Sequence, residues 1–421
     1  MSLNLGLVGC GGMGMRHAHG YIELRKHFDT FTLSAVCDRH KEAANGVASA
    51  VEDATGHRPQ VFTDYEAMLA SGVDAVDIVT DTRMHHVFAL QAFDAGVHIL
   101  TEKPMALTMK ACRLMRDAAE AKGLVLSIGE QYRRDPMNRL AKALLDAGAI
   151  GELGFAMKVS LGGGSGLMHD TGWRALKSRA GSVIIEQGVH EADLLIYFLG
   201  DIESLSAHTG LFAPTRVREG MSGQIAQFYS HRVEDAFANQ ETVEIDQEDT
   251  AIGLLKFASG AIGQLTITNA SIGYSAGINT IHGSAGTMQM PPTRTGIPPS
   301  IYLESQSEPL GEQEMLDLVP DWEVDETTAT FFGGATRMGS YDVGFEAIDR
   351  ILVAIEMQEL ASAIESGDRN VEVDAEVGMK ALAVSYGILE SGNSGQPVSL
   401  ADIMDGSVAE YQSEIDREAG I

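Results

Sequence analysis

The 421-residue sequence is poor in cysteine and in basic residues, and it lacks any long apolar run. Its three cysteines, Cys10, Cys37 and Cys112, are an odd number without a Cys-x-x-Cys spacing, which argues against a disulfide framework and a structural zinc site. We therefore expect reduced thiols, a reducing compartment and no metal. No apolar run approaches the ~18 residues of a membrane span, so a membrane is not an expected partner.

The shortage of basic residues excludes a further class of partner. Lys and Arg total 30 against 59 for Asp and Glu, which gives a formal net charge of −29. Such an acidic surface repels phosphate backbones and anionic lipid headgroups, so nucleic acid is not expected either. The segment after Met1, Leu3–Val8, has no basic residues before it and reads as a first strand, not as a signal peptide. We expect a cytoplasmic protein.

The first 128 residues alternate between short apolar runs and longer amphipathic stretches. This alternation predicts an α/β fold with a parallel, doubly wound sheet and right-handed crossovers, as in a Rossmann domain. The expected strands are 3–8, 31–37, 61–62, 75–80, 97–101 and 124–128. The expected helices are 13–28, 40–54, 65–70, 84–95 and 109–121.

The pattern changes after about residue 130. Strands at 251–257 and 261–269 flank Ala258-Ser259-Gly260, which predicts a hairpin and a mostly antiparallel second sheet. Helical periodicity returns at three places, and two regions rich in Gly, Pro and acidic residues read as long loops. The helices are expected at 136–147, 343–365 and 376–391, and the loops at 210–248 and 291–335.

A glycine-rich sequence lies between the first predicted strand and the first predicted helix. It reads Gly9-Cys10-Gly11-Gly12-Met13-Gly14, a Gly-x-Gly-x-x-Gly pattern in the context that gives the pattern meaning. Gly9 would permit a tight turn, Gly11 a close approach of the pyrophosphate of a dinucleotide, and Gly14 close packing of helix on strand. The helix N-terminus, with Gly12 and Met13, would bind the anion. The alternative is a purely structural glycine turn.

A carboxylate at the end of the second strand suggests which dinucleotide binds. Asp38 lies 24 positions after Gly14, close to the roughly 20 expected for the residue that accepts the adenosine ribose hydroxyls. A carboxylate there would repel a 2′-phosphate, although Arg39 could offset this repulsion. We therefore expect NAD in preference to NADP. Asp38 could also serve as the N-cap of the helix that follows.

Several segments together resemble one enzyme family. Thr101-Glu102-Lys103-Pro104 follows the fifth predicted strand and is similar to a motif of the Gfo/Idh/MocA oxidoreductases, the glucose–fructose oxidoreductase and inositol dehydrogenase family. The segments Thr80–His85 and Gln131–Pro136 resemble others, with Asp81-Thr82 replacing Pro-Asn. Glu186-x-Gly188-x-His190-x-x-Asp193 resembles the family's Asp-x-Gly-x-His-x-x-Asp, with Glu for the first Asp.

This resemblance implies a division into two domains and an activity. It implies a Rossmann domain over residues 1–128 and, over 129–421, an α/β domain with an open, mostly antiparallel sheet, whose C-terminal helices could pack back on the first domain. The second domain would bind substrate and build a homodimer or homotetramer. The reaction would be hydride transfer between NAD(P) and a hydroxyl of a sugar or cyclitol. Thr80, His85, Glu102 and Lys103 would join the cofactor site.

Oxidation of a secondary alcohol needs a base for the hydroxyl proton. His190 is the candidate, and Asp193 lies one turn away, where it could orient the imidazole. Lys103 would stabilise alkoxide charge from the rim of the Rossmann sheet. Glu186, four positions before His190, would share its helix face and assist it. The alternatives are a satisfied core histidine at His190 and a solvated surface lysine at Lys103.

Four further residues have weaker assignments. Trp173 and Arg174 follow a glycine-rich loop and could stack on a sugar and bind its hydroxyls, or could simply pack as a lid. Arg133 could bind substrate or tie the domains together, and Asp193, already named beside His190, is a further candidate for substrate contact. His17 is expected near the cofactor, or as a packing residue.

Two other activities compete with a dehydrogenase. One is a redox-neutral lyase or hydrolase in which bound NAD oxidises a sugar only transiently, and the departure at Glu186 keeps this interpretation open. The other is a nucleotide-binding regulator without chemistry, which would require neither Lys103 nor His190.

Overall fold

The computed structural model describes residues 2–167, 171–218 and 240–421. The N-terminal part contains a six-stranded parallel sheet in the order β3-β2-β1-β4-β5-β6. Its strands are β1 (Leu3–Val8), β2 (Phe31–Cys37), β3 (Gln60–Phe62), β4 (Ala75–Ile78), β5 (His98–Glu102) and β6 (Leu126–Gly129). The helices between them are α1 (Gly12–Leu24), α2 (Lys41–Thr55), α3 (Tyr65–Leu69), α4 (Thr82–Asp94) and α5 (Met109–Lys122). This is the predicted Rossmann arrangement.

The strands of this sheet are largely buried because helices cover both faces. All four residues of β4, at the centre, and of β6, at one edge, are buried. The order places β1 and β4 side by side at the centre, where the direction of winding reverses. Ligands of doubly wound sheets bind in the crevice beyond the carboxyl ends of strands at such a reversal. The residues after β1, β2, β4 and β5 therefore share one edge.

An eight-stranded sheet forms the second part, in the order β15-β14-β13-β7-β12-β11-β8-β16. Its pairs are antiparallel except β12 with β7, as the predicted mostly antiparallel sheet requires. The predicted hairpin is β11 (Thr250–Phe257) with β12 (Ile262–Thr268). The other strands are β7 (Leu153–Leu161), β8 (Ile202–Gly210), β13 (Ala276–Gly283), β14 (Gly286–Gln289), β15 (Ser300–Leu303) and β16 (Val398–Ser399).

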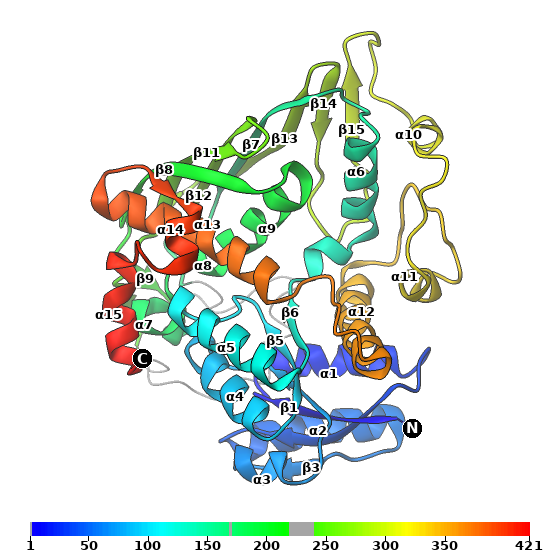
Figure 1. Cartoon of the computed structure of the whole chain (residues 1–421), viewed down its shortest axis with the longest axis vertical. Helices are drawn as coiled ribbons and strands as arrows, with labels where there is room; N and C mark the ends of the chain where they lie inside the picture. The colour runs from blue at the N-terminus through cyan, green and yellow to red at the C-terminus, as the bar shows by residue number, and fades with distance from the viewer. Residues whose placement is uncertain (1, 168–170, 219–239) are drawn as a thin grey trace.

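Among the residues that the structure describes, helices cover one face of this sheet. Helices α9 (Gly188–Leu199) and α13 (Ala375–Ser394) lie on the inner face, between the two sheets, where they share a core with Leu205 and Leu255 (Figure 1). Along β11 buried and exposed residues alternate strictly. The outer face exposes six large apolar side chains, namely Phe155, Ile252, Leu254, Ile262, Ile278 and Tyr302.

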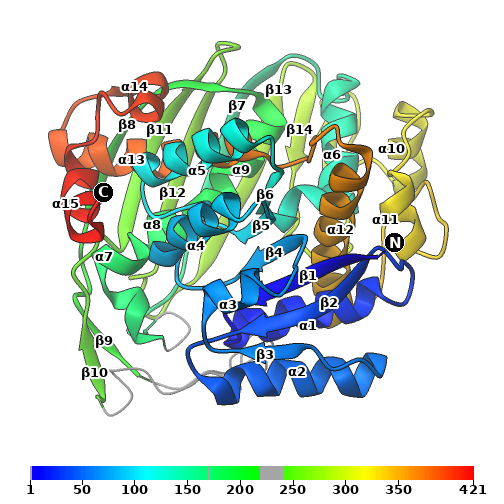
Figure 2. The ribbon, with the colours of Figure 1, turned by 60° about the horizontal axis from the view of Figure 1, so that its bottom comes forward.

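Two C-terminal helices lie against the Rossmann part. Helix α12 (Phe345–Ser366) packs against α1 and shares its apolar core (Figure 2). Helix α15 (Glu410–Ala419) covers the N-terminus of α5, where Gln412 accepts a hydrogen bond from the backbone N–H of Met109 at 2.8 Å. Further helices are η1 (Gln131–Arg134), α6 (Pro136–Asp146), η3 (Gly172–Ala175), α7 (Lys177–Ala180), α8 (Val183–Glu186) and α14 (Leu400–Asp405).

The prediction of two long loops is partly wrong. Residues 291–335 contain β15, α10 (Glu312–Leu318) and α11 (Glu326–Phe331), and 210–248 contain the strand pair β9 (Thr215–Val217) and β10 (Thr242–Glu244), with residues 219–239 outside the described part. These elements have three to seven residues, too few for a periodic pattern to stand out. They also depend on partners distant in sequence, as β15 does on β14. In the described ranges, no helix is long and apolar enough to cross a membrane.

Candidate active site

The glycine loop connects β1 to α1 and has the shape that a pyrophosphate requires. Gly9 has φ +94°, and a Cβ there would lie 2.3 Å from the carbonyl oxygen of Val79. A Cβ at Gly14 would lie 1.9 Å from the carbonyl oxygen of Gly9, so both positions exclude larger residues. A Cβ at Gly11 would meet nothing within 4 Å. The loop is therefore packed on its inner side and open at Gly11, above the N-terminus of α1, and it fits a dinucleotide.

Asp38 lies directly after β2, beside this loop. One carboxylate oxygen accepts the backbone N–H of Cys10 at 2.8 Å, and the other accepts that of His40 at 2.8 Å. The second bond closes the turn that precedes α2. The N-cap of α2 is His40, without a side-chain cap, so the alternative role of Asp38 as an N-cap is wrong. Arg39 is exposed, and its Nε donates to the ring of His40 at 3.1 Å. These positions fit a ribose at the edge formed by β1 and β2.

The loops after β4 and β5 are joined by a buried histidine. One ring nitrogen of His85 is 3.0 Å from the carbonyl oxygen of Pro104, and the other is 3.3 Å from that of Thr80. His85 therefore holds together two of the predicted cofactor segments. His85 as a whole is 1% exposed, whereas Thr80 is partly exposed.

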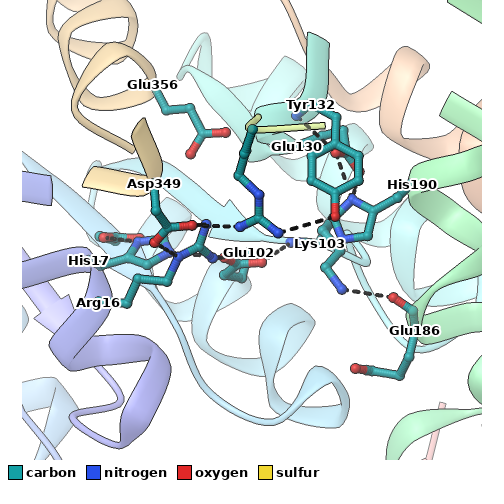
Figure 3. A network of polar contacts seen from close by, with 12 residues as sticks. Arg16, His17, Glu102, Lys103, Glu130, Tyr132, Glu186, His190, Asp349 and Glu356 are labelled. Carbon is teal, nitrogen blue, oxygen red and sulfur yellow. Dashed lines mark hydrogen bonds and ion pairs between the residues drawn. The ribbon is translucent and has the colours of Figure 1, made fainter. Parts of the chain in front are cut away.

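Glu102 belongs to a buried charge network beneath the site (Figure 3). His17 lies between two carboxylates, with Nδ1 2.8 Å from Asp77 and Nε2 3.0 Å from Glu102. Burial alone would lower the pKa of His17, but the two carboxylates raise it to about 10. Burial would raise the pKa of Glu102, yet His17, Arg16 and Lys103 lower it to about 2. His17 and Glu102 thus form an ion pair that supports the lysine loop from below.

Lys103 extends from this loop toward the second part of the chain. Its Nζ donates to the backbone carbonyl of Glu186 at 2.8 Å. Glu186 is the last residue of α8, and α9 with His190 begins two residues later at Gly188. Figure 3 shows Lys103 and His190 next to each other, although 87 positions separate them in the sequence.

His190 has a carboxylate partner that the sequence analysis did not identify. Both carboxylate oxygens of Glu130 lie 2.7 Å from Nδ1 of His190. Glu130 follows β6 directly and is 2% exposed. The ring of Tyr132 stacks on that of His190, with centroids 4.3 Å apart and an interplanar angle of 20°.

The expectation that Asp193 orients His190 is therefore wrong. Asp193 accepts a hydrogen bond from Nε of Arg133 at 2.7 Å. Both residues are buried, and burial raises the pKa of Asp193 although Arg133 opposes the rise. Side chains three positions apart on a helix point in somewhat different directions, so Asp193 can contact a different neighbour from His190. That neighbour is Arg133, whose buried charge requires a partner. Arg133 thus ties η1 to α9.

Glu186 does not share a helix face with His190, because α8 ends at Glu186. Its carboxylate points away from His190 in Figure 3 and is directed at two other groups. Nε of Arg174 lies 3.2 Å from one oxygen, and the hydroxyl of Thr82 lies 3.3 Å from the other. The guanidinium of Arg174 is also 4.4 Å from the ring centroid of Trp173. The predicted substrate residues Trp173 and Arg174 therefore cluster around Glu186.

The structure brings Lys103, His190 and Glu186 together at the edge of the Rossmann sheet that holds the glycine loop. In the described ranges, no group of three or more His, Cys, Asp or Glu side chains is arranged to hold a metal. Glu130 was missed because a lone Glu after a strand has no distinctive spacing. The signal that could have found Glu130 is its position directly after β6. A residue there is expected to be buried, and a buried carboxylate requires a partner.

Comparison with known protein families gives two matches along the chain. A family model described as "Oxidoreductase family, NAD-binding Rossmann fold" matches residues 3–130. A model described as "GFO/IDH/MocA C-terminal domain" matches residues 138–289. Together the two matches span more than half of the chain.

Individual relatives agree with these models. A levoglucosan dehydrogenase from Pseudarthrobacter phenanthrenivorans is 28% identical over 292 residues, which cover 68% of this chain and 73% of the relative. A 1,5-anhydro-D-fructose reductase from Ensifer adhaerens is 32% identical over 245 residues, covering 54% of this chain and 70% of the relative. A solved structure of levoglucosan dehydrogenase in complex with NADH superposes with a TM-score of 0.75 at 22% identity, covering 95% of this chain and 99% of that one.

Proposed function

Because this chain belongs to the Gfo/Idh/MocA oxidoreductases, with their NAD-binding Rossmann fold, we propose that it oxidises a secondary hydroxyl of a sugar, cyclitol or sugar derivative with NAD. The family match confirms the predicted family, fold class, cofactor and class of enzyme. The substrate class is supported by relatives that act on levoglucosan and 1,5-anhydro-D-fructose.

One observation supports the proposal most directly. Lys103, from the turn after β5, donates to the chain just before the helix that bears His190, so an ammonium and an imidazole meet at the cofactor edge of the Rossmann sheet. Oxidation of an alcohol needs a base for the hydroxyl proton and is favoured by a cation beside the same oxygen, and these two groups can supply both. A nucleotide-binding regulator would need neither.

The chain's own residues would divide the work as follows. The glycine loop would hold the pyrophosphate, and Asp38 would hold the adenosine ribose. Bound NAD would supply the acceptor for the hydride that leaves the substrate carbon. Nε2 of His190 takes the hydroxyl proton, and Lys103 stabilises the negative charge that develops on the same oxygen. Trp173, Arg174, Glu186 and Arg133 are candidates for contacts with the rest of the substrate.

A substrate screen tests this proposal. The protein is incubated with NAD and a panel of anhydrosugars, pyranosides, aldoses and inositols, and NADH absorbance is followed with His190→Ala as the inactive control. We expect NADH formation with at least one member. A product screen by mass spectrometry runs in parallel. Redox-neutral conversion of a sugar without NADH would replace the proposal by the lyase or hydrolase.

We also propose that the protein forms a homodimer or homotetramer through its second sheet. The six exposed apolar side chains of the outer face lie on five strands of one sheet, β7, β11, β12, β13 and β15. Contiguous apolar patches of this kind mark contact surfaces in soluble proteins.

A further inference from the structure

We propose that Glu130 is a positioning residue that fixes the orientation and tautomer of His190, so that Nε2 faces the reacting hydroxyl. This inference rests on the proposed dehydrogenase function, but it concerns a contact that exists without substrate or cofactor. Glu130 is the first residue after β6, whereas His190 lies in the first turn of α9. Only the tertiary structure brings the two together.

The geometry assigns one ring nitrogen to Glu130. Both carboxylate oxygens are 2.7 Å from Nδ1, so this nitrogen faces Glu130 and the opposite edge of the ring carries Nε2. An ionised carboxylate is an acceptor only, and it therefore requires a hydrogen on Nδ1. In a neutral imidazole with hydrogen on Nδ1, Nε2 has the lone pair that a general base needs.

Glu130 has the surroundings of an ionised carboxylate. Burial alone would raise its pKa, but the interaction with His190, the charge of Lys103 and the backbone N–H of Tyr132 together lower it. The N–H of Tyr132 also donates to Oε1 at 3.3 Å and restrains the carboxylate itself. Glu130 thus bonds to the proposed base, His190, and is also close enough to Lys103 for the charge of that ammonium to lower its pKa.

The plane of the imidazole is restrained by a second contact. The Tyr132 ring stacks on His190, and the guanidinium of Arg294 lies 5.3 Å from the centroid of the Tyr132 ring. Arg294 in turn donates to Asp349 at 2.6 Å. The edge contact with Glu130 and the face contact with Tyr132 together leave the ring little rotational freedom.

The other acidic residues of the motif around His190 are directed elsewhere. Asp193 pairs with Arg133, and the carboxylate of Glu186 faces Arg174 and Thr82. Glu191, adjacent to His190, pairs with Lys158 at 2.7 Å. Glu130 is therefore the carboxylate that this structure assigns to the imidazole.

Its chemical effect follows from the charge. During alcohol oxidation the hydroxyl proton moves to Nε2 and the imidazole becomes an imidazolium. Glu130 keeps its own ionisation state throughout and stabilises the imidazolium through the bond to Nδ1. An aspartate in this relation to a catalytic histidine can be worth about 10⁴-fold in turnover when the tautomer depends on it.

The test compares the native protein with Glu130→Gln, Glu130→Asp and the matched control Glu191→Gln. Nitrogen-15 NMR of histidine-labelled protein without substrate reports the tautomer of His190, which is identified by its loss in His190→Ala. We expect the Nδ1–H form in the native protein and in the control. In Glu130→Gln we expect a mixture of tautomers, because an amide can donate to Nδ1 or accept from it. Thermal unfolding checks that each variant folds.

Kinetics with a substrate from the screen give the second readout. Glu130→Gln should lower kcat on the order of 10²-fold and alter its pH profile, with NADH affinity within about twofold of native. Glu130→Asp, which keeps the charge, should recover part of this loss. Native tautomer populations in Glu130→Gln would overturn the proposal. If Glu130→Gln changes the tautomer of His190 but the native protein oxidises no sugar, the role of Glu130 as a positioning residue stands. The proposed dehydrogenase activity is then contradicted.

Discussion

The ammonium of Lys103 donates a hydrogen bond to the backbone carbonyl of Glu186 at 2.8 Å. The bond joins the turn after the fifth Rossmann strand to the end of α8, immediately before the helix of His190. The distance between the two proposed catalytic groups therefore depends on how the Rossmann part and the second sheet pack together. A substrate oxygen that binds the ammonium of Lys103 would either replace the carbonyl of Glu186 as its hydrogen-bond acceptor or share the ammonium with it.

The first prediction concerns this pair of residues. Lys103→Ala should reduce turnover through lost stabilisation of the alkoxide, and His190→Ala through lost proton transfer, each on the order of 10²-fold or more. NADH affinity, measured by fluorescence, should change little in His190→Ala because the Rossmann part holds the dinucleotide. Lys380→Ala, which removes a surface pair with Asp201, is the control. Full activity in either active-site variant would remove that residue from the mechanism.

The second prediction concerns cofactor choice. The native protein should bind NAD more tightly than NADP, because the carboxylate of Asp38 repels a 2′-phosphate. Asp38→Ser should shift the preference toward NADP, with Arg39 then able to pair with the phosphate. Asp53→Ser, an exposed position on α2, should leave the preference unchanged. Dissociation constants for both cofactors decide the matter, and tighter NADP binding by the native protein would contradict the role of Asp38.

The third prediction concerns stability and pH. Asp77 and Glu102 outweigh burial and raise the pKa of His17 from its ordinary 6.5 to about 10. The folded protein therefore holds this proton more tightly than the unfolded chain does. The contribution of His17 to the free energy of unfolding is complete below about pH 6.5 and falls as the pH rises toward 10.

Urea unfolding between pH 6 and 10 measures this contribution. His17→Gln should flatten the decline in unfolding free energy relative to the native protein. His208→Gln, at an exposed position on β8, should preserve the native slope. An identical slope in the native protein and in His17→Gln would mean that His17 is not charged in the folded state.

The fourth prediction concerns assembly. Sedimentation equilibrium at micromolar concentration should give a dimer or tetramer of the 45.0 kDa chain. Leu254→Glu places a charge on the exposed face of β11, where the native side chain is 64% exposed, and should shift the protein toward monomer. Lys110→Glu, on the exposed side of α5, should not do so. A monomeric native protein would contradict the proposal that the second sheet forms an interface between subunits.

The sequence was sufficient for features that depend on neighbouring residues. Apolar periodicity predicted the strands and helices of the Rossmann part, because a buried strand and an amphipathic helix each follow a local pattern. The glycine loop was also predictable, because its turn and its close contacts restrict Gly9 and Gly14 whatever surrounds them. Asp38 could be singled out from its place at a strand end, since parallel strands bring their carboxyl ends to one edge. Lys103 lies at such an end too, but its predicted role came from the resemblance of its motif to the family.

Only the tertiary structure decided which charges are paired. His190 has Asp193 within one helical turn, yet its partner is Glu130, sixty positions away, while Asp193 faces Arg133. A buried charge requires a partner, and the partner is a group that packing brings near it. Which carboxylate pairs with His190 therefore depends on how α9 is oriented against β6 and η1. The network of His17 and the short elements at 300–331 depend likewise on contacts distant in sequence. Local patterns therefore determined the scaffold and the edge where the site lies, whereas packing determined which carboxylate faces the histidine.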